Sequence, residues 1–420
     1  MSFFDKVSSS KPIKTKSASP VELTVTDTSS SVKEEVSFIL TKVKQLKGHL
    51  NQCFIEREEA IENLFLALAT GSNLLLLGPP GTGKSHLITE LTKHIEEARL
   101  FSWLLNRTSD PAEIVGPFSM KAMEQDQFIR VTTGKLPEAE IVFLDELFKA
   151  NEPVLNICLP LINEKVFYNG PTPTKVPLIS LFAASNEFPA EDEGLEALYD
   201  RLLLRMWVDY IKEPVHRLKL LQSASQPRPT CSTRLTLSEI QTLQQACQQV
   251  KVTHQLLQHL NTIVSDLGQK GLTISDRRLV KCLDVLKAQA LLNGRMTAYT
   301  DDLKVLTYVL WEKEGDFDIV CDIISSKMNP YREELSQIQI ALQDIQTRLP
   351  VMKQRQVKEQ QAFYTESDKK IKKLATLFND LYKKASSYGV NPSPYLQLKE
   401  ELLETGRQVL NYAIQTKANS

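Results

Sequence analysis

The chain has 420 residues, of which 42 % are hydrophobic and 24 % are charged, with 50 Lys or Arg residues against 51 Asp or Glu residues. This length allows two to four domains, and a net charge of −1 gives no general attraction to DNA or to an anionic membrane. The six cysteines form no Cys-x-x-Cys pair, which argues against a disulfide framework or a zinc ribbon. Because no apolar stretch could span a bilayer and no secretory leader is present, we expect a cytoplasmic protein.

Residues 1–32 are rich in Ser, Thr, Lys and Pro, and we expect them to form a disordered tail. The alternative is a docking tail that becomes ordered on a partner. Residues 36–50 and 60–69 have the apolar spacing of helices. A helix ahead of the first strand of a nucleotide-binding sheet often lines the base pocket. Ile55 is therefore a candidate contact for adenine, with ordinary core packing as the alternative.

A phosphate-binding loop follows, in which two glycines five positions apart precede Lys and Ser. Its residues are Gly78, Pro79, Pro80, Gly81, Thr82, Gly83, Lys84 and Ser85. The apolar run 74–77 before it predicts a buried strand, and 86–95 after it predicts a helix. A strand, a glycine turn and a helix in this order direct backbone N–H groups at an anion. We expect Lys84 to reach the β- and γ-phosphates and Ser85 to bind Mg²⁺.

Two further strands are predicted after the phosphate-binding loop, and the second of them ends in a pair of carboxylates. Residues 100–105 predict a second strand, and after a break at 116–118 the stretch 120–136 allows a short inserted helix. The apolar run 141–144 then leads into Asp145 and Glu146. Ligands of an open α/β sheet lie at the carboxyl ends of its strands, so this pair should lie beside the phosphates. Asp145 would hold Mg²⁺ through water, and Glu146 would polarise the attacking water.

Residues 154–162 predict a helix, and Asn169-Gly170 predicts a hairpin between 166–170 and 175–179. We expect the second arm of this hairpin to continue into 181–185 and to end at Asn186. An amide at this strand end can bond the γ-phosphate or the attacking water. The alternative for Asn186 is an ordinary turn.

Residues 195–204 have the apolar spacing of a helix and include Arg201. Arg205 follows four positions after Arg201. Two arginines at this spacing share one helix face, as a surface ion-pair site or as an arginine finger for a neighbouring subunit. Residues 214–229 then contain a domain boundary, and 237–311 predict helices. Ser275 can cap one of these helices, which places Arg277 in its first turn, where a lid could bring it to the phosphates.

From residue 331 the apolar residues follow a heptad pattern, which Pro350 breaks or kinks. A second heptad series covers 357–378, a loop covers 388–392, and 398–414 predict a last amphipathic helix. We expect an antiparallel helical bundle or a short coiled coil. The fold class is thus α/β, with a parallel sheet, a helical lid and a C-terminal helical bundle.

Together these motifs resemble the MoxR family of AAA+ ATPases, with the nearest likeness to its RavA-like branch. The likeness covers roughly residues 34–325 and is carried by residues 77–81, 136–146, 183–187, 196–201 and 275–278. It fades after about residue 330, where the nearly continuous helices leave no room for the small β-rich domain of RavA-like proteins. A partner that depends on that domain is therefore not expected here.

The resemblance implies an AAA+ αβα sandwich that uses ATP/ADP and Mg²⁺. It makes Lys84 and Ser85, with the rest of their loop and His86, the Walker A site and Asp145 with Glu146 the Walker B site. It makes Asn186 sensor 1, Arg201 the arginine finger with Arg205 as second choice, and Arg277 sensor 2. It also implies a hexameric ring with ATP between subunits, and chaperone-like remodelling with a partner that bears a von Willebrand A (vWA) domain.

We accordingly expect a tail at 1–32, a nucleotide-binding domain at 33–212, a lid at 213–325 and a bundle at 326–420. Two other functions compete with a protein-remodelling ATPase. A nucleic-acid motor is disfavoured by the near-neutral charge and the lack of a DNA-binding module. A nucleotide-gated scaffold with little turnover is disfavoured by the intact Glu146 and Arg201.

Overall fold

The structure is a computed structural model that describes residues 28–189, 196–313, 315–352 and 355–418. The first helix, α1, spans Thr28–Cys53, so it begins inside the segment that the sequence predicted as a tail. The rest of that predicted tail lies outside the described residues. In the described part of the chain, no helix is both long enough and apolar enough to cross a membrane.

A five-stranded parallel sheet forms the centre of the N-terminal half, in the order β3-β4-β7-β1-β8. The strands are β1 (Leu74–Leu77), β3 (Leu100–Leu104), β4 (Ile141–Asp145), β7 (Ser180–Ser185) and β8 (Leu204–Trp207). The first four residues of β4 and all residues of β1 and β7 are buried, as in sheets with helices on both faces. Because the strands are parallel, the segments that follow β1, β4 and β7 meet at one edge of the sheet.

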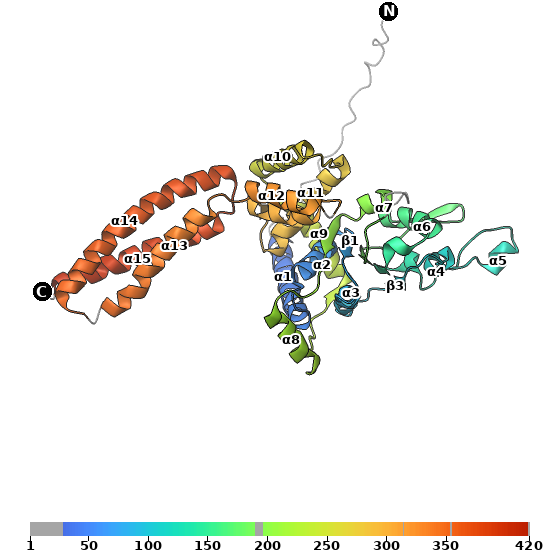
Figure 1. Ribbon diagram of the computed structural model, residues 1–420, viewed down its shortest axis with the longest axis horizontal. Coiled ribbons are helices and arrows are strands. Elements are labelled where there is room, and N and C mark those ends of the chain that lie inside the picture. Colours follow the sequence, from blue (N-terminus) through green and yellow to red (C-terminus); the bar gives the residue numbers. More distant parts are fainter. Residues whose placement is uncertain (1–27, 190–195, 314, 353–354, 419–420) are drawn as a thin grey trace, which may run out of the picture.

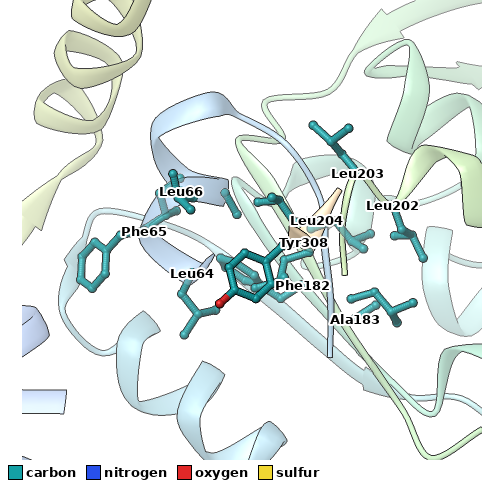
Figure 2. Packing of buried hydrophobic residues seen from close by; sticks show 14 of the residues in the cluster. Leu64, Phe65, Leu66, Phe182, Ala183, Leu202, Leu203, Leu204 and Tyr308 are labelled. Carbon is teal, nitrogen blue, oxygen red and sulfur yellow. The ribbon is translucent and has the colours of Figure 1, made fainter. Parts of the chain in front are cut away.

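Helices pack around this sheet (Figure 1). They are α1, α2 (Glu58–Thr70), α3 (Lys84–Thr92), α4 (Pro111–Val115), α6 (Glu152–Asn163) and α7 (Glu196–Arg201), with short 3-10 turns at Leu136–Glu138 and Leu147–Lys149. The short helix α5 (Met120–Met123) lies on an arm that projects away from the sheet and buries none of its residues (Figure 1). Figure 2 shows how Leu64 of α2, Phe182 of β7 and Tyr308 from the lid meet in the core. The sheet and the lid therefore share one hydrophobic core, which fixes the lid against the nucleotide-binding half.

Two predictions for this half need correction. The segment predicted as one helix over 195–204 is α7 followed by strand β8, and Arg205 lies within that strand opposite Leu75. Arg201 and Arg205 therefore do not share a helix face. The predicted hairpin is present, but β5 (Val166–Asn169) pairs with β6 (Thr172–Lys175), and β7 is a separate strand.

The lid consists of helices with short breaks, as predicted for residues 237–311. Its elements are α8 (Pro214–Ala224), α9 (Leu237–Gln249), α10 (His254–Gln269), α11 (Asp276–Leu292), the 3-10 helix η3 (Thr300–Tyr308) and α12 (Asp316–Lys327). Two short parallel pairs were not predicted, β2 (Ile95–Glu96) with β9 (Leu235–Thr236) and β10 (Lys251–Val252) with β11 (Thr297–Ala298). An ion pair of 2.6 Å between Lys42 and Glu239 holds α9 against α1.

The C-terminal helices α13 (Arg332–Met352), α14 (Val357–Tyr388) and α15 (Ser393–Ala418) form a bundle that projects from the body (Figure 1). The predicted heptad positions from Leu335 to Leu349 are buried in a second core, separate from the first. Pro350 lies inside the last turn of α13, which ends two residues later. The bundle joins the lid at Gly389, whose carbonyl accepts a 3.1 Å hydrogen bond from the Thr300 N–H.

Candidate nucleotide-binding site

The predicted phosphate loop connects the carboxyl end of β1 to the first turn of α3. At Gly78 a Cβ atom would lie 2.2 Å from the carbonyl oxygen of Val208, so only glycine fits there. Gly81 and Gly83 have φ angles of 79° and 86°, and a Cβ at either position would meet nothing within 4 Å. The loop thus packs tightly where it leaves the sheet and is open where it bends. An anion can approach the backbone at that bend.

Lys84 is buried at the base of this loop. Its Nζ donates hydrogen bonds to the carbonyls of Gly78 (2.6 Å) and Pro79 (2.9 Å) and to Oδ1 of Asn186 (3.1 Å). Burial lowers the pKa of Lys84, and the nearby carboxylates of Glu146 and Asp145 oppose that shift. A cation is therefore held where the phosphates of a nucleotide would lie.

The two carboxylates predicted to form the Walker B site join the same network from strand β4. Asp145 Oδ2 accepts a 2.7 Å hydrogen bond from the Ser85 hydroxyl, which pairs the two residues predicted to hold Mg²⁺. Glu146 follows with a left-handed φ of 53°, and its carboxylate accepts a hydrogen bond from the Asn186 amide. Asn186 therefore contacts both Lys84 and Glu146. The structure brings together the residues that the sequence placed at three different strand ends.

A cavity of about 580 Å³ opens beside the loop at Gly81, Thr82 and Gly83. This volume lies within the range of small-molecule pockets. Ile55 and His86, both predicted to contact the nucleotide, line the cavity. Phe54 packs edge-to-face on His86 at 5.0 Å between ring centroids, so the end of α1 and the start of α3 form a continuous wall.

Three arginines and a tyrosine that line this cavity were not predicted from the sequence: Arg57, Arg217, Arg228 and Tyr210. Arg57 donates to the Thr82 carbonyl at 3.1 Å, and the Tyr210 hydroxyl donates to the Pro80 carbonyl at 3.2 Å, so both brace the loop. Arg228 lies in the proline-rich stretch that the sequence suggested only as a domain boundary. No periodic pattern marks these residues, because they come together only when the chain folds.

Arg228 and His86 form a coupled pair across the cavity. Arg228 Nη1 lies 2.6 Å from His86 Nε2, which must accept that hydrogen bond. Burial, and next the Arg228 charge, lower the pKa of His86, so its imidazole is neutral at pH 7. The cavity therefore presents positive charge beside the phosphate loop together with an apolar surface at Phe54 and Ile55.

Arg201 lies at the other edge of the sheet. Its carbonyl accepts a 3.3 Å hydrogen bond from Asn73, which directly precedes β1, whereas the phosphate loop directly follows β1. Four strand residues separate these two edges by roughly 13 Å. Among the described residues that line the cavity, Arg201 is absent. The Arg201 backbone therefore lies at the opposite edge of the sheet from the phosphate loop.

Arg277 lies at the same edge as Arg201. Ser275 caps α11 as predicted, and Arg277 is exposed in the first turn of that helix. The next residue, Arg278, is 2 % exposed and forms a 3.2 Å ion pair with Asp200. This contact fixes the start of α11 against the end of α7, and it was not predicted. Arg277 is thus held near Arg201, and like Arg201 it is not among the described residues lining the cavity.

Arg205, the second choice for the finger, is 0 % exposed. Its guanidinium donates to the carbonyls of Leu202 (3.0 Å), Trp311 (2.7 Å) and Tyr199 (2.6 Å). It also lies 3.7 Å from the centroid of the Tyr199 ring. Burial, and next the nearby Arg278, lower the pKa of Arg205 to about 9, which still leaves it charged at pH 7. A side chain enclosed in this way cannot reach a neighbouring subunit.

Comparison with known proteins agrees with this geometry. Residues 41–245 match the family described as the MoxR domain in the MoxR-vWA-beta-propeller ternary systems, and residues 250–324 match an AAA lid domain. An uncharacterized protein of Methanocaldococcus jannaschii is 38 % identical over 301 residues, which cover 71 % of this chain and 78 % of the relative. The chain belongs to the MoxR family of AAA+ ATPases. Its nucleotide-binding fold and lid are those of this family.

Other relatives extend the comparison. A second uncharacterized protein of Methanocaldococcus jannaschii is 37 % identical over 66 % of this chain and 73 % of the relative. A structural protein of Acidianus two-tailed virus is 27 % identical over 71 % of this chain and 54 % of the viral protein. The crystal structure of an ATPase candidate from Cytophaga hutchinsonii superimposes with a TM-score of 0.58 at 18 % identity, over 70 % of this chain and 97 % of that one. This last likeness supports the fold.

The site of this MoxR-family chain fits a magnesium nucleotide. The open backbone at Gly81 and Gly83, the buried Lys84 ammonium and the paired oxygens of Ser85 and Asp145 supply the donors and acceptors that such a ligand needs. Magnesium prefers oxygen ligands and often binds proteins through one or two carboxylates together with substrate phosphates.

Proposed function

We propose that this chain hydrolyses ATP with Mg²⁺ at the interfaces of a homo-oligomeric, hexameric ring and uses the cycle to remodel a protein partner. The observation that carries the proposal is the position of Asn186, which bonds both the Walker A lysine and the Walker B glutamate. One amide thus links the group that would bind the phosphates to the group that would activate water. A site used only for binding would not need this connection.

The roles of the side chains follow from their chemistry. Lys84 would hold the β- and γ-phosphates, and Ser85 and Asp145 would hold Mg²⁺, which neutralises charge on the phosphates when bound. Glu146, whose carboxylate accepts a hydrogen bond from the Asn186 amide, would orient and polarise the attacking water. The Asn186 amide keeps the Glu146 carboxylate directed toward Lys84.

The placement of Arg201 and Arg277 favours action on a neighbouring subunit. Both lie at the amino-terminal edge of the sheet, away from the phosphate loop of their own chain, and contacts through Asp200 and Arg278 hold them together. In a head-to-tail ring this edge of one subunit would face the nucleotide of the next. An arginine supplied in trans stabilises charge that develops in the transition state.

A mixing experiment tests this proposal. The Lys84→Ala chain should not bind ATP but still presents Arg201, whereas the Arg201→Ala chain binds ATP but lacks the finger. Mixed rings should contain interfaces with an intact finger opposite an intact site, and ATPase activity should return. The matched control mixes Lys84→Ala with the Lys84→Ala/Arg201→Ala double variant, which has no intact site and should stay inactive. If mixed rings form but remain inactive, Arg201 does not act in trans.

For the partner, we propose a protein with a vWA domain, because the matching family is described from systems that contain one. The segment between α4 and β4 offers a contact surface, since Phe118, Met120 and Phe128 are 41 %, 76 % and 69 % exposed there. Affinity purification of the Glu146→Gln chain with ATP, followed by mass spectrometry, tests this. Membership of the RavA-like branch stays a prediction, since the matching family is described from the ternary systems.

A second candidate is a nucleotide-gated scaffold. The likeness to a viral structural protein favours it, since that relative is described by an architectural role. Steady-state turnover separates the two. A remodelling ATPase should turn over many ATP molecules and respond to its partner, whereas a scaffold should bind one nucleotide per site and hydrolyse it slowly.

A further inference from the structure

A cluster of nitrogen and oxygen donors lies between α1 and α3, next to the nucleotide cavity but outside the Walker motifs. One ligand atom each from His49, Glu90 and His94 lies within 4.8 Å of the others. The two imidazoles are nearly enclosed, at 6 % and 4 % exposure, and their ring centroids are 5.1 Å apart in an edge-to-face arrangement. Two buried histidines that face one carboxylate are unusual as core packing, because each carries polar nitrogens.

The donors come from two neighbouring helices and the turn that follows one of them. His49 lies on α1, Glu90 lies on α3, and His94 lies in the turn just after α3 ends at Thr92. Cys53 Sγ lies 3.8 Å from His49 Nε2 but does not belong to the group of ligand atoms that all lie within 4.8 Å of one another.

Neighbouring residues already hold the outer atoms of these ligands. The Thr233 carbonyl lies 3.0 Å from His94 Nδ1, the contact by which a carbonyl commonly orients a metal-binding imidazole. In this tautomer Nδ1 carries the proton, so Arg234 Nη1, 2.8 Å away, donates to the carbonyls of Cys231 and Thr233 instead. Lys93 holds Glu90 Oε2 at 2.9 Å. His94 Nε2 and Glu90 Oε1 are then the atoms available for a metal.

We propose that His49, Glu90 and His94 bind Zn²⁺ between α1 and the phosphate-loop helix. Two imidazoles and a carboxylate suit Zn²⁺, whereas Mg²⁺ prefers oxygen ligands. The metal joins the end of α1, where Ile55 lines the cavity, to α3, which begins at Lys84. It therefore fixes the wall of the nucleotide cavity to the phosphate loop.

Calorimetric titration of the full-length, tag-free chain with Zn²⁺ alone, in the absence of nucleotide, tests the site. We expect one Zn²⁺ per chain, a higher melting temperature with Zn²⁺, and no comparable effect of Mg²⁺. Loss of an outer contact typically weakens metal sites 10–100-fold, so His49→Ala, which removes a direct ligand, should weaken binding by about 100-fold or more. The matched control is His254→Ala, since His254 is an exposed histidine on α10 and should have no effect.

Glu90→Gln provides a second test that keeps the shape of the side chain and removes its charge, and circular dichroism checks that the variants fold. The proposal is wrong if the wild-type chain binds less than one Zn²⁺. It is also wrong if His49→Ala and Glu90→Gln, both folded, bind Zn²⁺ as the wild type does. Because no ATP is present, these outcomes do not depend on the proposed ATPase function.

Discussion

Replacing Arg205 by alanine should destabilise the fold rather than remove a catalytic group. The side chain is 0 % exposed and donates hydrogen bonds to three backbone carbonyls, which come from α7, from the turn after it and from the lid. One of these acceptors is Trp311, so Arg205 connects the sheet to the lid. Alanine would leave the three carbonyls without this donor and would open a cavity.

The magnitude follows from these contacts. Hydrogen bonds to charged groups contribute about 1.5–3 kcal/mol each, so three of them sum to at least about 4.5 kcal/mol. Removing the buried guanidinium also removes the free-energy cost of its desolvation, which offsets this loss by several kcal/mol. Where one member of a buried charged pair has been removed, the folded state has typically lost about 3–5 kcal/mol of stability. We therefore expect a loss of about 3–5 kcal/mol, or roughly 6–20 °C in melting temperature.

Thermal unfolding followed by circular dichroism measures this, with Arg201→Ala as the matched control. Arg201 is only partly buried, so its loss should change stability far less while reducing ATPase activity sharply. Arg205→Lys should lie between wild type and Arg205→Ala, since lysine keeps the charge without the planar fork that reaches three acceptors. The prediction is wrong if Arg205→Ala has the same melting temperature as the wild type. If that variant is as stable as the wild type but has no ATPase activity, Arg205 has a catalytic role instead.

Three further predictions concern the nucleotide site. Lys84→Ala should abolish tight ATP binding, because it removes the charge that pairs with the β- and γ-phosphates; an unchanged affinity in a nucleotide titration would refute the phosphate-loop assignment. Glu146→Gln should bind ATP as the wild type does but turn over very slowly, and normal turnover would mean that another residue positions water. Arg228→Ala should weaken nucleotide binding without lowering the melting temperature, since Arg228 is exposed; equal affinity would place the nucleotide away from it.

The sequence predicted the core of the site because its signals are local. Glycines, a lysine and apolar runs that end in Asp145 or Asn186 define strand ends, and parallel pairing of β1, β4 and β7 then brings those ends together. To predict that Lys84, Glu146 and Asn186 lie close together, it was enough to assume a parallel sheet. The cavity residues Tyr210 and Arg228 could not be found in this way, because their positions depend on how irregular segments fold over the loop.

The error at Arg205 has a different origin. The run Leu202, Leu203 and Leu204 fits a helix as well as a buried strand, and short apolar runs do not distinguish the two by period. The structure resolves the ambiguity through pairing, since Leu204 lies opposite Leu74 and the chain leaves the helix at Arg201. Because the chain passes from helix α7 to strand β8 here, Arg205 is buried in the strand, whereas Arg201 at the end of the helix is partly exposed.

The junction between the lid and the C-terminal bundle depends on Gly389. This residue ends α14 with a left-handed φ of 86°, and its carbonyl accepts the hydrogen bond from Thr300 of the lid. A Cβ atom at this position would lie 2.7 Å from Cβ of Gln255, which belongs to α10. Neither atom can move without its backbone, so the two elements would have to separate.

Gly389→Ala should therefore cost more than the left-handed conformation alone, which is about 1–2 kcal/mol for a residue with a Cβ atom. Gly294→Ala is the matched control, because Gly294 has a φ of 75° and a Cβ there would meet nothing within 4 Å. We expect Gly389→Ala to lower the melting temperature more than Gly294→Ala does. The loop near residue 390 should also become more sensitive to protease, because the bundle has its own core and can separate from the lid without unfolding. The double variant Gln255→Gly/Gly389→Ala removes the clashing atom and should restore protection of the loop, after allowance for the separate cost of Gln255→Gly. Equal losses in Gly389→Ala and Gly294→Ala would show that the contact with Gln255 does not hold the bundle to the lid.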